Sequence, residues 1–208
     1  MIEPYNAKYL SPSKEFRRLS LLLQIKENSN ISQHTLADRS HLSSSMVNVY
    51  IREMTEEELL TVSGNSNRTI SYHLTEKGNK YLYKHFLAFS AETVQIYASV
   101  KREITRLLKQ FESRGIRTLV LYGASDTAEI VNAAIQQTRL VVIGVIDSDP
   151  AKQGQLFNNG TIIQSPENLS HIAPDAVLIT SFARQNEIHE NIEKLGSPDI
   201  KILKLANI

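Results

Sequence analysis

The sequence predicts an α/β protein of two small domains joined by a long helix. The chain has 208 residues, which exceeds the roughly 150 residues of a typical single domain. Its first part has apolar residues at helical spacing, whereas residues 116–208 alternate short β-branched runs with amphipathic segments. The second pattern is typical of a parallel sheet covered by helices. We therefore expect an N-terminal domain at 1–80, a connecting helix at 81–114 and an α/β domain at 115–208.

The composition narrows the class of protein. The chain has no cysteine, which excludes disulfides, thiolate zinc sites and a cysteine nucleophile. No apolar run reaches the roughly 18 to 20 residues that span a bilayer, and the N-terminus lacks the apolar core of a signal peptide. Residues 1–90 hold 11 Lys or Arg and 9 Asp or Glu, and residues 91–208 hold 12 and 13. We expect a cytoplasmic protein without a broad basic surface.

After a first helical segment, in which Phe16, Leu19, Leu22, Leu23 and Ile25 recur at helical spacing, two short helices and a hairpin are predicted in the N-terminal domain. Ser32 is a suitable N-cap for a helix at about 33–39, and Ser43 for the helix that follows. Apolar side chains lie on or beside one face of this second helix: Met46, Val47, Tyr50, Ile51 and Met54. The strand-like runs 59–63 and 69–74 are joined by a loop rich in Gly and Asn, which favours a hairpin.

The order helix, turn, helix, hairpin is carried by ISQHTLADRSHLSSSMVNVYIREM, LLTV and ISYHLTEKG within residues 31–78. This region resembles the winged helix-turn-helix of MarR-like bacterial transcription regulators. The resemblance implies binding to double-stranded DNA, although some winged helices contact only proteins. One residue departs from the family's pattern, because Glu58 stands where a turn glycine is common.

The second helix and the hairpin tip supply the predicted DNA contacts. Asn and Arg on a helix in the major groove read adenine and guanine, and serines at a helix N-terminus suit phosphates. Basic and amide side chains at the hairpin tip suit a minor groove or a phosphate. The predicted DNA-binding residues are Ser43, Ser44, Ser45, Asn48, Val49, Arg52, Asn65, Asn67 and Arg68.

A long helix is predicted from Thr75 to Ser113. A narrow stripe follows it at steps of three and four: Leu82, Phe86, Phe89, Thr93, Tyr97, Val100, Ile104, Leu107 and Phe111. Such a stripe is typical of a seam with another helix, here one from a second chain in a homodimer. The alternative is that the stripe packs against the chain's own domains.

The C-terminal domain has the strand–helix–strand pattern of a parallel sheet. Predicted strands lie at 118–122, 140–146 and 176–180, with shorter ones at 161–163 and 200–205. Predicted helices lie at 126–137 and 183–195.

The loop after the first strand partly fits the dinucleotide fingerprint G-x-G-x-x-G/A. Gly123 and Ala128 are present, but Ser125 replaces the middle glycine that lets a pyrophosphate approach. Ser125 and Thr127 could bind a phosphate at the helix start, whereas the charge of Asp126 opposes one. Asp147 follows the second strand, where an acid in this fold binds a ribose diol.

The strings VVIGVIDSDPAKQGQ, TIIQSPENL and PDAVLITSFARQNEI resemble small Rossmann-like domains beside sugar-nucleotide acetyltransferases and in some sugar methyltransferases. The resemblance implies a crevice formed by the glycine loop, the acid and a later hydroxyl pair. The first residues of the helix predicted at 126–137 are added to this set. The candidate ligand-binding residues are therefore Gly123, Ala124, Ser125, Asp126, Thr127, Asp147, Thr180 and Ser181. The implied effector is a nucleotide-sugar, and NAD(H) is the alternative.

No catalytic or metal-binding pattern is present in the sequence. The six histidines are scattered without ligand spacing, and no serine has the context of a nucleophile elbow. We expect a dimeric DNA-binding transcription regulator with a nucleotide-sensing C-terminal domain. Two alternatives are an NAD(H)-sensing redox repressor and a non-catalytic accessory protein of sugar biosynthesis whose winged helix binds protein.

Overall fold

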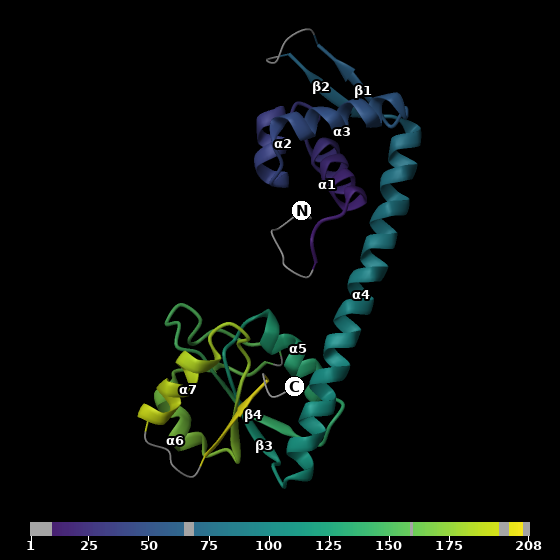
Figure 1. The fold of residues 1–208 in the computed structure, drawn as a ribbon. Coiled ribbons are helices and arrows are strands. Elements are labelled where there is room, and N and C mark those ends of the chain that lie inside the picture. The colour runs from purple at the N-terminus through teal and green to yellow at the C-terminus, as the bar shows by residue number, and fades with distance from the viewer. Residues whose placement is uncertain (1–9, 65–68, 159, 196–199, 206–208) are drawn as a thin grey trace. The chain divides into compact units, whose positions relative to one another are not determined.

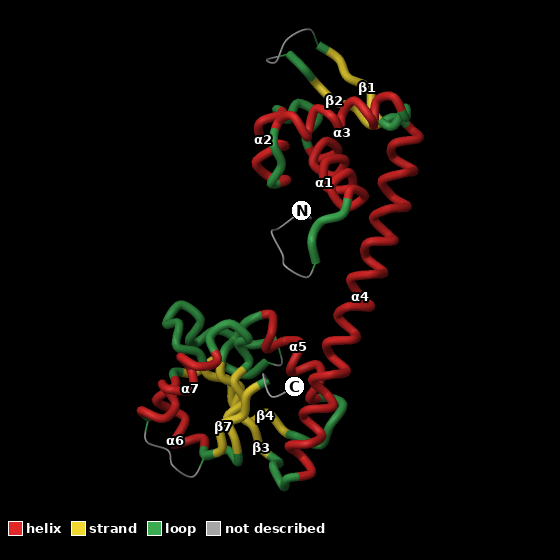
Figure 2. The backbone as a smooth tube through the Cα atoms, viewed as in Figure 1, coloured by secondary structure: helices red, strands yellow, loops and turns green. Residues whose placement is uncertain are grey.

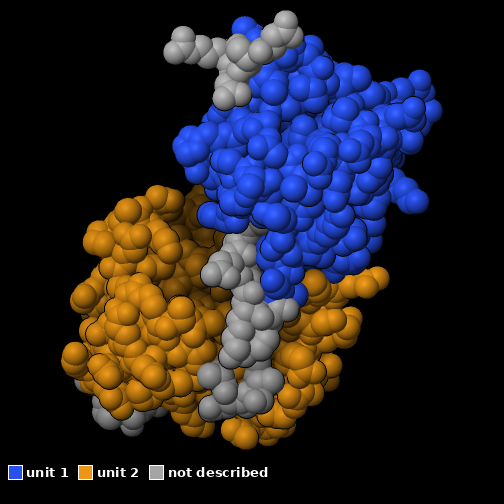
Figure 3. All heavy atoms as spheres, turned by 45° about the horizontal axis from the view of Figure 1, so that its top comes forward, with its two compact units in different colours: residues 1–94 blue, residues 95–208 orange. Residues whose placement is uncertain are grey.

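The computed structural model describes residues 10–64, 69–158, 160–195 and 200–205 (Figure 1). Two compact units divide the chain, residues 1–94 and residues 95–208, and the boundary lies within helix α4 (Glu76–Ser113). Figure 3 colours these units separately. The three-part division that we expect from the sequence remains a prediction. No helix among the described residues has the length and apolarity needed to cross a membrane.

Unit 1 contains three short helices and a two-stranded antiparallel hairpin ahead of α4 (Figure 2). These elements are α1 (Lys14–Glu27), α2 (Gln33–Ser40), α3 (Ser44–Glu56), β1 (Leu60–Ser63) and β2 (Ser71–Leu74). Ser13, Ser32 and Ser43 are the N-caps of the three helices, and each hydroxyl oxygen accepts a hydrogen bond from the backbone N–H three residues on. The predicted helices, both predicted caps and the hairpin are confirmed.

The core of unit 1 joins all three short helices to the hairpin. Its most deeply buried side chains include Leu21, Leu22, Leu36, Val47, Met54 and Tyr72. The apolar face predicted for α3 is buried apart from Met46, which is 38% exposed. Arg18 of α1 lies in this core and makes a two-point ion pair with Glu57, directly after α3. Its guanidinium also lies 5.3 Å from the centre of the Tyr81 ring.

The sequence LTEKG forms a tight connection between the hairpin and α4. The backbone N–H of Gly78 donates to the Thr75 hydroxyl oxygen at 2.9 Å, and that hydroxyl donates to the Glu58 carbonyl at 2.6 Å. A Cβ on Gly78 would lie 2.0 Å from the Leu59 carbonyl oxygen, so only glycine allows this approach. Glu58 has a φ of 61°, the left-handed conformation that a glycine adopts more easily.

The predicted seam with a second chain along α4 is wrong at both ends of the helix, where the stripe packs within the chain's own units. Leu82 is buried in unit 1, and the Phe89 ring packs 5.2 Å from that of Phe16. Ile104 and Phe111 are buried against the sheet of unit 2, so much of the stripe fills the chain's own cores. The large apolar side chains that α4 leaves exposed are Tyr83, Phe86, Leu87, Val94, Ile96, Tyr97 and Val100.

Unit 2 contains a five-stranded sheet in which every pair of neighbours is parallel. The strands are β3 (Thr118–Tyr122), β4 (Val141–Ile146), β5 (Ile163–Gln164), β6 (Ala176–Ile179) and β7 (Lys201–Lys204). Their order, β5-β4-β3-β6-β7, places the first strand in the centre. If the strands of this sheet are numbered from one in chain order, their order is 3-2-1-4-5. The first five strands of dinucleotide-binding sheets have the same order. Four of the five predicted strands are confirmed, three of them one or two residues shorter, whereas the strand predicted at 161–163 is shifted and overlaps β5 only at Ile163.

Helices cover both faces of this sheet. They are the C-terminal part of α4, α5 (Asp126–Ile135), the 3₁₀ turn η1 (Pro166–Asn168), α6 (Leu169–Ile172) and α7 (Gln185–Lys194). One core contains residues of α4 and α5 with Leu119 and Leu121, and the other contains residues of α6 and α7 with Val120 and Tyr122. Alternate residues of β3 therefore face opposite cores. All four residues of β6 are buried, as expected for a strand covered on both faces.

The edge of the sheet at β4 is irregular. Leu119 pairs with Val142 and Val120 pairs with Gly144, so Ile143 is an extra residue in β4. β5 pairs only with the last two residues of β4, Val145 and Ile146. Val141 and Ile143 are 55% and 39% exposed at this edge.

Candidate functional site

The outward face of α3 gathers most of the residues predicted to contact DNA. Ser44, Ser45, Asn48, Val49 and Arg52 are all exposed, whereas the opposite face of the helix is buried. The Arg52 guanidinium lies 3.8 Å from the Glu56 carboxylate, and both side chains are about 70% exposed. An exposed pair of this kind contributes little free energy, so the guanidinium remains available to another acceptor.

The serines at the start of α3 have different roles. The Ser43 oxygen accepts from the Met46 N–H at 3.2 Å and lies 2.8 Å from the Ser45 hydroxyl oxygen. Ser43 therefore uses its side chain as a helix cap. A phosphate at this position would instead meet the backbone N–H groups of the first turn, which have no partner within a helix.

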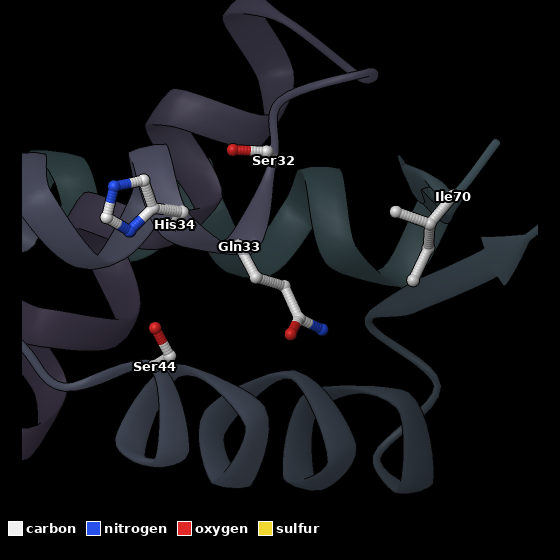
Figure 4. A pocket seen from close by; sticks show the side chains of 5 residues that line it. All are labelled: Ser32, Gln33, His34, Ser44 and Ile70. Carbon is white, nitrogen blue, oxygen red and sulfur yellow. The ribbon is translucent and has the colours of Figure 1, made fainter. Parts of the chain in front are cut away.

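A groove of 280 Å³ lies between the starts of α2 and α3 (Figure 4). It is lined by Ser32, Gln33, His34, Ser44 and Ile70. Figure 4 shows the Gln33 side chain extending from the start of α2 toward α3, with Ile70 on the approach to β2. Gln33 and His34 are not among the residues predicted from the sequence, although the cap at Ser32 places both in the first turn of α2. They extend the polar surface beside Ser44.

The hairpin tip holds the remaining predicted DNA contacts. Asn65, Asn67 and Arg68 lie outside the described residues. At the base of the tip, Gly64 has a φ of 93°, and a Cβ there would lie 2.1 Å from the Thr69 carbonyl oxygen. The wing therefore depends on a glycine at this position.

At the carboxyl edge of the sheet, Asp147 connects two loops of unit 2. Its carboxylate accepts hydrogen bonds from the Ala124 N–H at 2.7 Å and the Asp149 N–H at 2.9 Å, and it lies 3.2 Å from the Lys152 ammonium. Burial alone would raise the pKa of Asp147, but these donors outweigh it and hold that pKa below its usual value. Asp147 is therefore ionised and already bonded within its own chain.

The other predicted ligand residues also lie around this edge. Thr180 is fully buried, and its hydroxyl is 2.6 Å from the Gly123 carbonyl oxygen, to which it donates. The Ser181 hydroxyl oxygen accepts from the Arg184 N–H at 3.2 Å. Ser125 and Asp126 are exposed at the start of α5, and Thr127 is partly buried. The three segments lie together in the structure, where Asp147 and Thr180 bond to neighbouring backbone.

A pocket of 460 Å³ opens beside these loops, on the side of α7. We call it the edge pocket; it is lined by Tyr122, Ser148, Pro150, Gln153, Ser165, Pro166, Glu167, Asn191, Lys194 and Leu195. None of these residues is among the ligand-binding residues predicted from the sequence. The signal for Ser148 and Ser165 was their position just after strands, because ligands of open α/β sheets bind at the carboxyl ends of the strands.

Within the described part of the chain, no group of three His, Asp or Glu side chains could hold a metal ion.

Unit 1 has the fold of a winged helix-turn-helix, with three short helices ahead of α4, a hairpin and an exposed face on α3. Residues 17–61 match the family described as winged helix-turn-helix DNA-binding. Residues 115–203 match a second family, described as C2185-like, N-terminal. No curated protein matches the chain in sequence.

Solved structures of bacterial proteins show partial similarity. BpsR of Bordetella bronchiseptica is 18% identical with a TM-score of 0.33, over 38% of this chain and 57% of that one. The M. tuberculosis transcriptional regulator MosR is 21% identical with a TM-score of 0.36, over 47% and 76%. MepR, a transcription regulator of the Staphylococcus aureus multidrug efflux pump MepA, is 14% identical with a TM-score of 0.36, over 49% and 76%. This chain thus spans 57% of BpsR.

Proposed function

We propose that the protein is a transcription regulator that binds DNA through α3 and responds to a small effector bound by unit 2. The carrying observation is the two-sided character of α3 within a winged helix-turn-helix. Its buried face anchors the helix, and its exposed face presents Asn48 and Arg52 beside serines at the helix start. Such a face supports base reading in the major groove, with phosphate contacts from the first turns of α2 and α3.

The regulator acts as a homodimer in this proposal. Three exposed side chains of α4 in unit 1 are spaced by four and seven residues: Tyr83, Leu87 and Val94. This spacing places them along one side of the helix, where they form an apolar surface suited to a second copy of the chain. Two copies would present two α3 helices to half-sites on the same DNA.

The proposed effector is a nucleotide-type molecule, a nucleotide-sugar in the first instance. Its support is the resemblance of the C-terminal strings together with the strand order of unit 2, whose carboxyl edge is the usual ligand position in such sheets. The effector changes DNA affinity only if it binds the DNA-competent arrangement and the other arrangement with different affinities.

Fluorescence anisotropy with duplex DNA from upstream of the protein's own gene tests the DNA-binding role. We expect affinity to fall as salt rises, because phosphate contacts release counterions. Arg52→Ala should weaken binding by about tenfold or more, as expected for a lost base contact worth about 1–3 kcal/mol. The matched control is Arg106→Ala, which removes an exposed arginine of α4 that also pairs with a nearby glutamate. Unchanged affinity in Arg52→Ala would contradict the proposed role of α3.

Sedimentation equilibrium tests the homodimer separately. Leu87→Asp places a charge on the proposed dimer surface and should convert the dimer to a monomer. Lys84→Asp, at an exposed polar position of the same helix, should leave the dimer intact. A monomeric wild-type protein at micromolar concentration would refute the dimer.

A further inference from the structure

The edge pocket is separate from the loop that begins at Gly123, which the sequence predicts as a ligand site. Its residues come from the last residue of β3, from the loops after the adjacent strands β4 and β5, and from the C-terminal end of α7. Ligand sites of this size are common, since small-molecule pockets typically measure about 300–1,000 Å³. The pocket therefore combines the position and the volume of a ligand site.

Its lining is polar without an excess of charge. Hydroxyls come from Tyr122, Ser148 and Ser165, and amides from Gln153 and Asn191. The one carboxylate, Glu167, is balanced by the one ammonium, Lys194, and the apolar contacts come from two prolines and a leucine. Hydroxyls and amides both donate and accept hydrogen bonds, so this set suits a ligand with many neutral hydroxyl groups.

The surroundings of the pocket disfavour a phosphate. Burial raises the pKa of Tyr122, and the negative charges of Asp147 and Glu167 raise it further. The phenol therefore remains a neutral hydroxyl in the pocket that Ser148 also lines, in a region where two carboxylates oppose a second anion. Lys152, which could attract a phosphate, is already paired with Asp147.

We propose that the edge pocket binds an uncharged polyol, such as a sugar ring, through Tyr122, Ser148, Ser165 and Asn191. The ring comes either from a free sugar or from the sugar part of a nucleotide-sugar. This assignment rests on the proposed function in one respect, that unit 2 holds the effector. It adds that the sugar, rather than the phosphate, occupies this pocket.

Calorimetric titration and saturation-transfer NMR on the full chain test the proposal with six probes. These are glucose, N-acetylglucosamine, UDP-glucose, UDP-N-acetylglucosamine, UDP and NADH. We expect a sugar-bearing probe to bind at least tenfold more tightly than UDP. Binding of the free sugar identifies a free sugar as the source, and binding only of its UDP derivative identifies a nucleotide-sugar.

Two variants assign that binding to the edge pocket. Asn191→Leu removes an amide from the wall, and Tyr122→Phe removes a hydroxyl while keeping the ring in the core. Each should weaken sugar binding at least tenfold, with the circular dichroism spectrum unchanged. The control is Asn186→Leu, on the same helix but outside the pocket, where the side chain contacts Lys204.

The proposal is overturned if no sugar-bearing probe binds, if UDP or NADH alone binds equally well, or if both pocket variants bind sugar like the wild type. DNA affinity measured on the same proteins separates the two proposals. Sugar binding without DNA binding would refute the regulator alone. DNA binding without sugar binding would refute the sugar pocket alone.

Discussion

The two units use their polar residues in opposite ways. In unit 1, Asn48 and Arg52 point away from a buried apolar face and are exposed to solvent. In unit 2, Asp147 and Thr180 are buried and bond to the backbone of neighbouring loops. A polar residue at a strand end therefore often forms hydrogen bonds with its own loops, whereas one on an exposed helix face is available to a partner. Substitutions should therefore affect stability in unit 2 and DNA binding on α3.

The largest expected effect comes from Asp147→Ala. This change leaves the Ala124 and Asp149 N–H groups and the Lys152 ammonium without their acceptor, which should lower the free energy of unfolding by about 3 kcal/mol. Urea denaturation followed by circular dichroism measures it. Asp126→Ala, which removes an exposed acid at the start of α5, should cost only about 0.5 kcal/mol. Equal stability of the two variants would show that the hydrogen bonds of the buried Asp147 contribute no more than the exposed Asp126.

Arg18→Met should cost about 2 kcal/mol in unit 1, because it removes a two-point ion pair in which Arg18 is buried and Glu57 is partly exposed. The hydrogen bond from Arg18 lowers the pKa of Glu57. The resulting stabilisation is fully present above the pKa of Glu57 in the unfolded chain, about 4.3, and is lost as pH falls through the lower folded-state pKa. Urea denaturation from pH 7 to pH 3 should show a smaller loss in the variant than in the wild type. An identical pH dependence would show that the pair contributes nothing.

Glu58→Gly should stabilise unit 1 by about 1 kcal/mol, because glycine adopts the positive φ at this turn without strain. The exposed ion pair with Lys77 is lost, at little cost. Thermal denaturation measures the gain. Glu58→Ala loses the same pair but keeps a Cβ, so a matching gain in that variant would exclude the backbone explanation.

The smallest effect on stability is expected from Asn48→Ala, within about 0.5 kcal/mol of the wild type, because the side chain is exposed. The same variant should lose base preference in competition anisotropy with altered DNA sites. A large loss of stability without a loss of preference would assign Asn48 a structural role and remove the contrast between the units.

Much of the fold could be predicted because its signals are local. Ser32 and Ser43 indicate where two helices begin, and the β-branched runs of unit 2 indicate buried strands. The departure at Glu58 was also informative, since the structure has the left-handed turn that the missing glycine would favour. Sequence patterns of this kind depend on a few neighbouring residues, so they can be interpreted without knowledge of tertiary contacts.

The candidate sites were less predictable because they depend on contacts between distant residues. The sequence suggests that Asp147 faces a ligand, but it cannot reveal that the Ala124 N–H occupies its carboxylate. Similarly, Asn191 reaches the edge pocket only because α7 packs beside the ends of earlier strands. The prediction of a dimer seam along the whole of α4 was wrong for the same reason, because helical spacing does not indicate which partner covers each apolar residue.

The extra residue in β4 has a consequence for the behaviour of the protein at high concentration. An unpaired sheet edge can recruit strands from other copies and begin aggregation, and the apolar side chains of Val141 and Ile143 would favour such pairing. The bulge at Ile143 bends the strand and disturbs the regular sequence of donors and acceptors that an incoming strand requires. We therefore expect the extra residue at Ile143 to disfavour polymerisation of the chain through this edge.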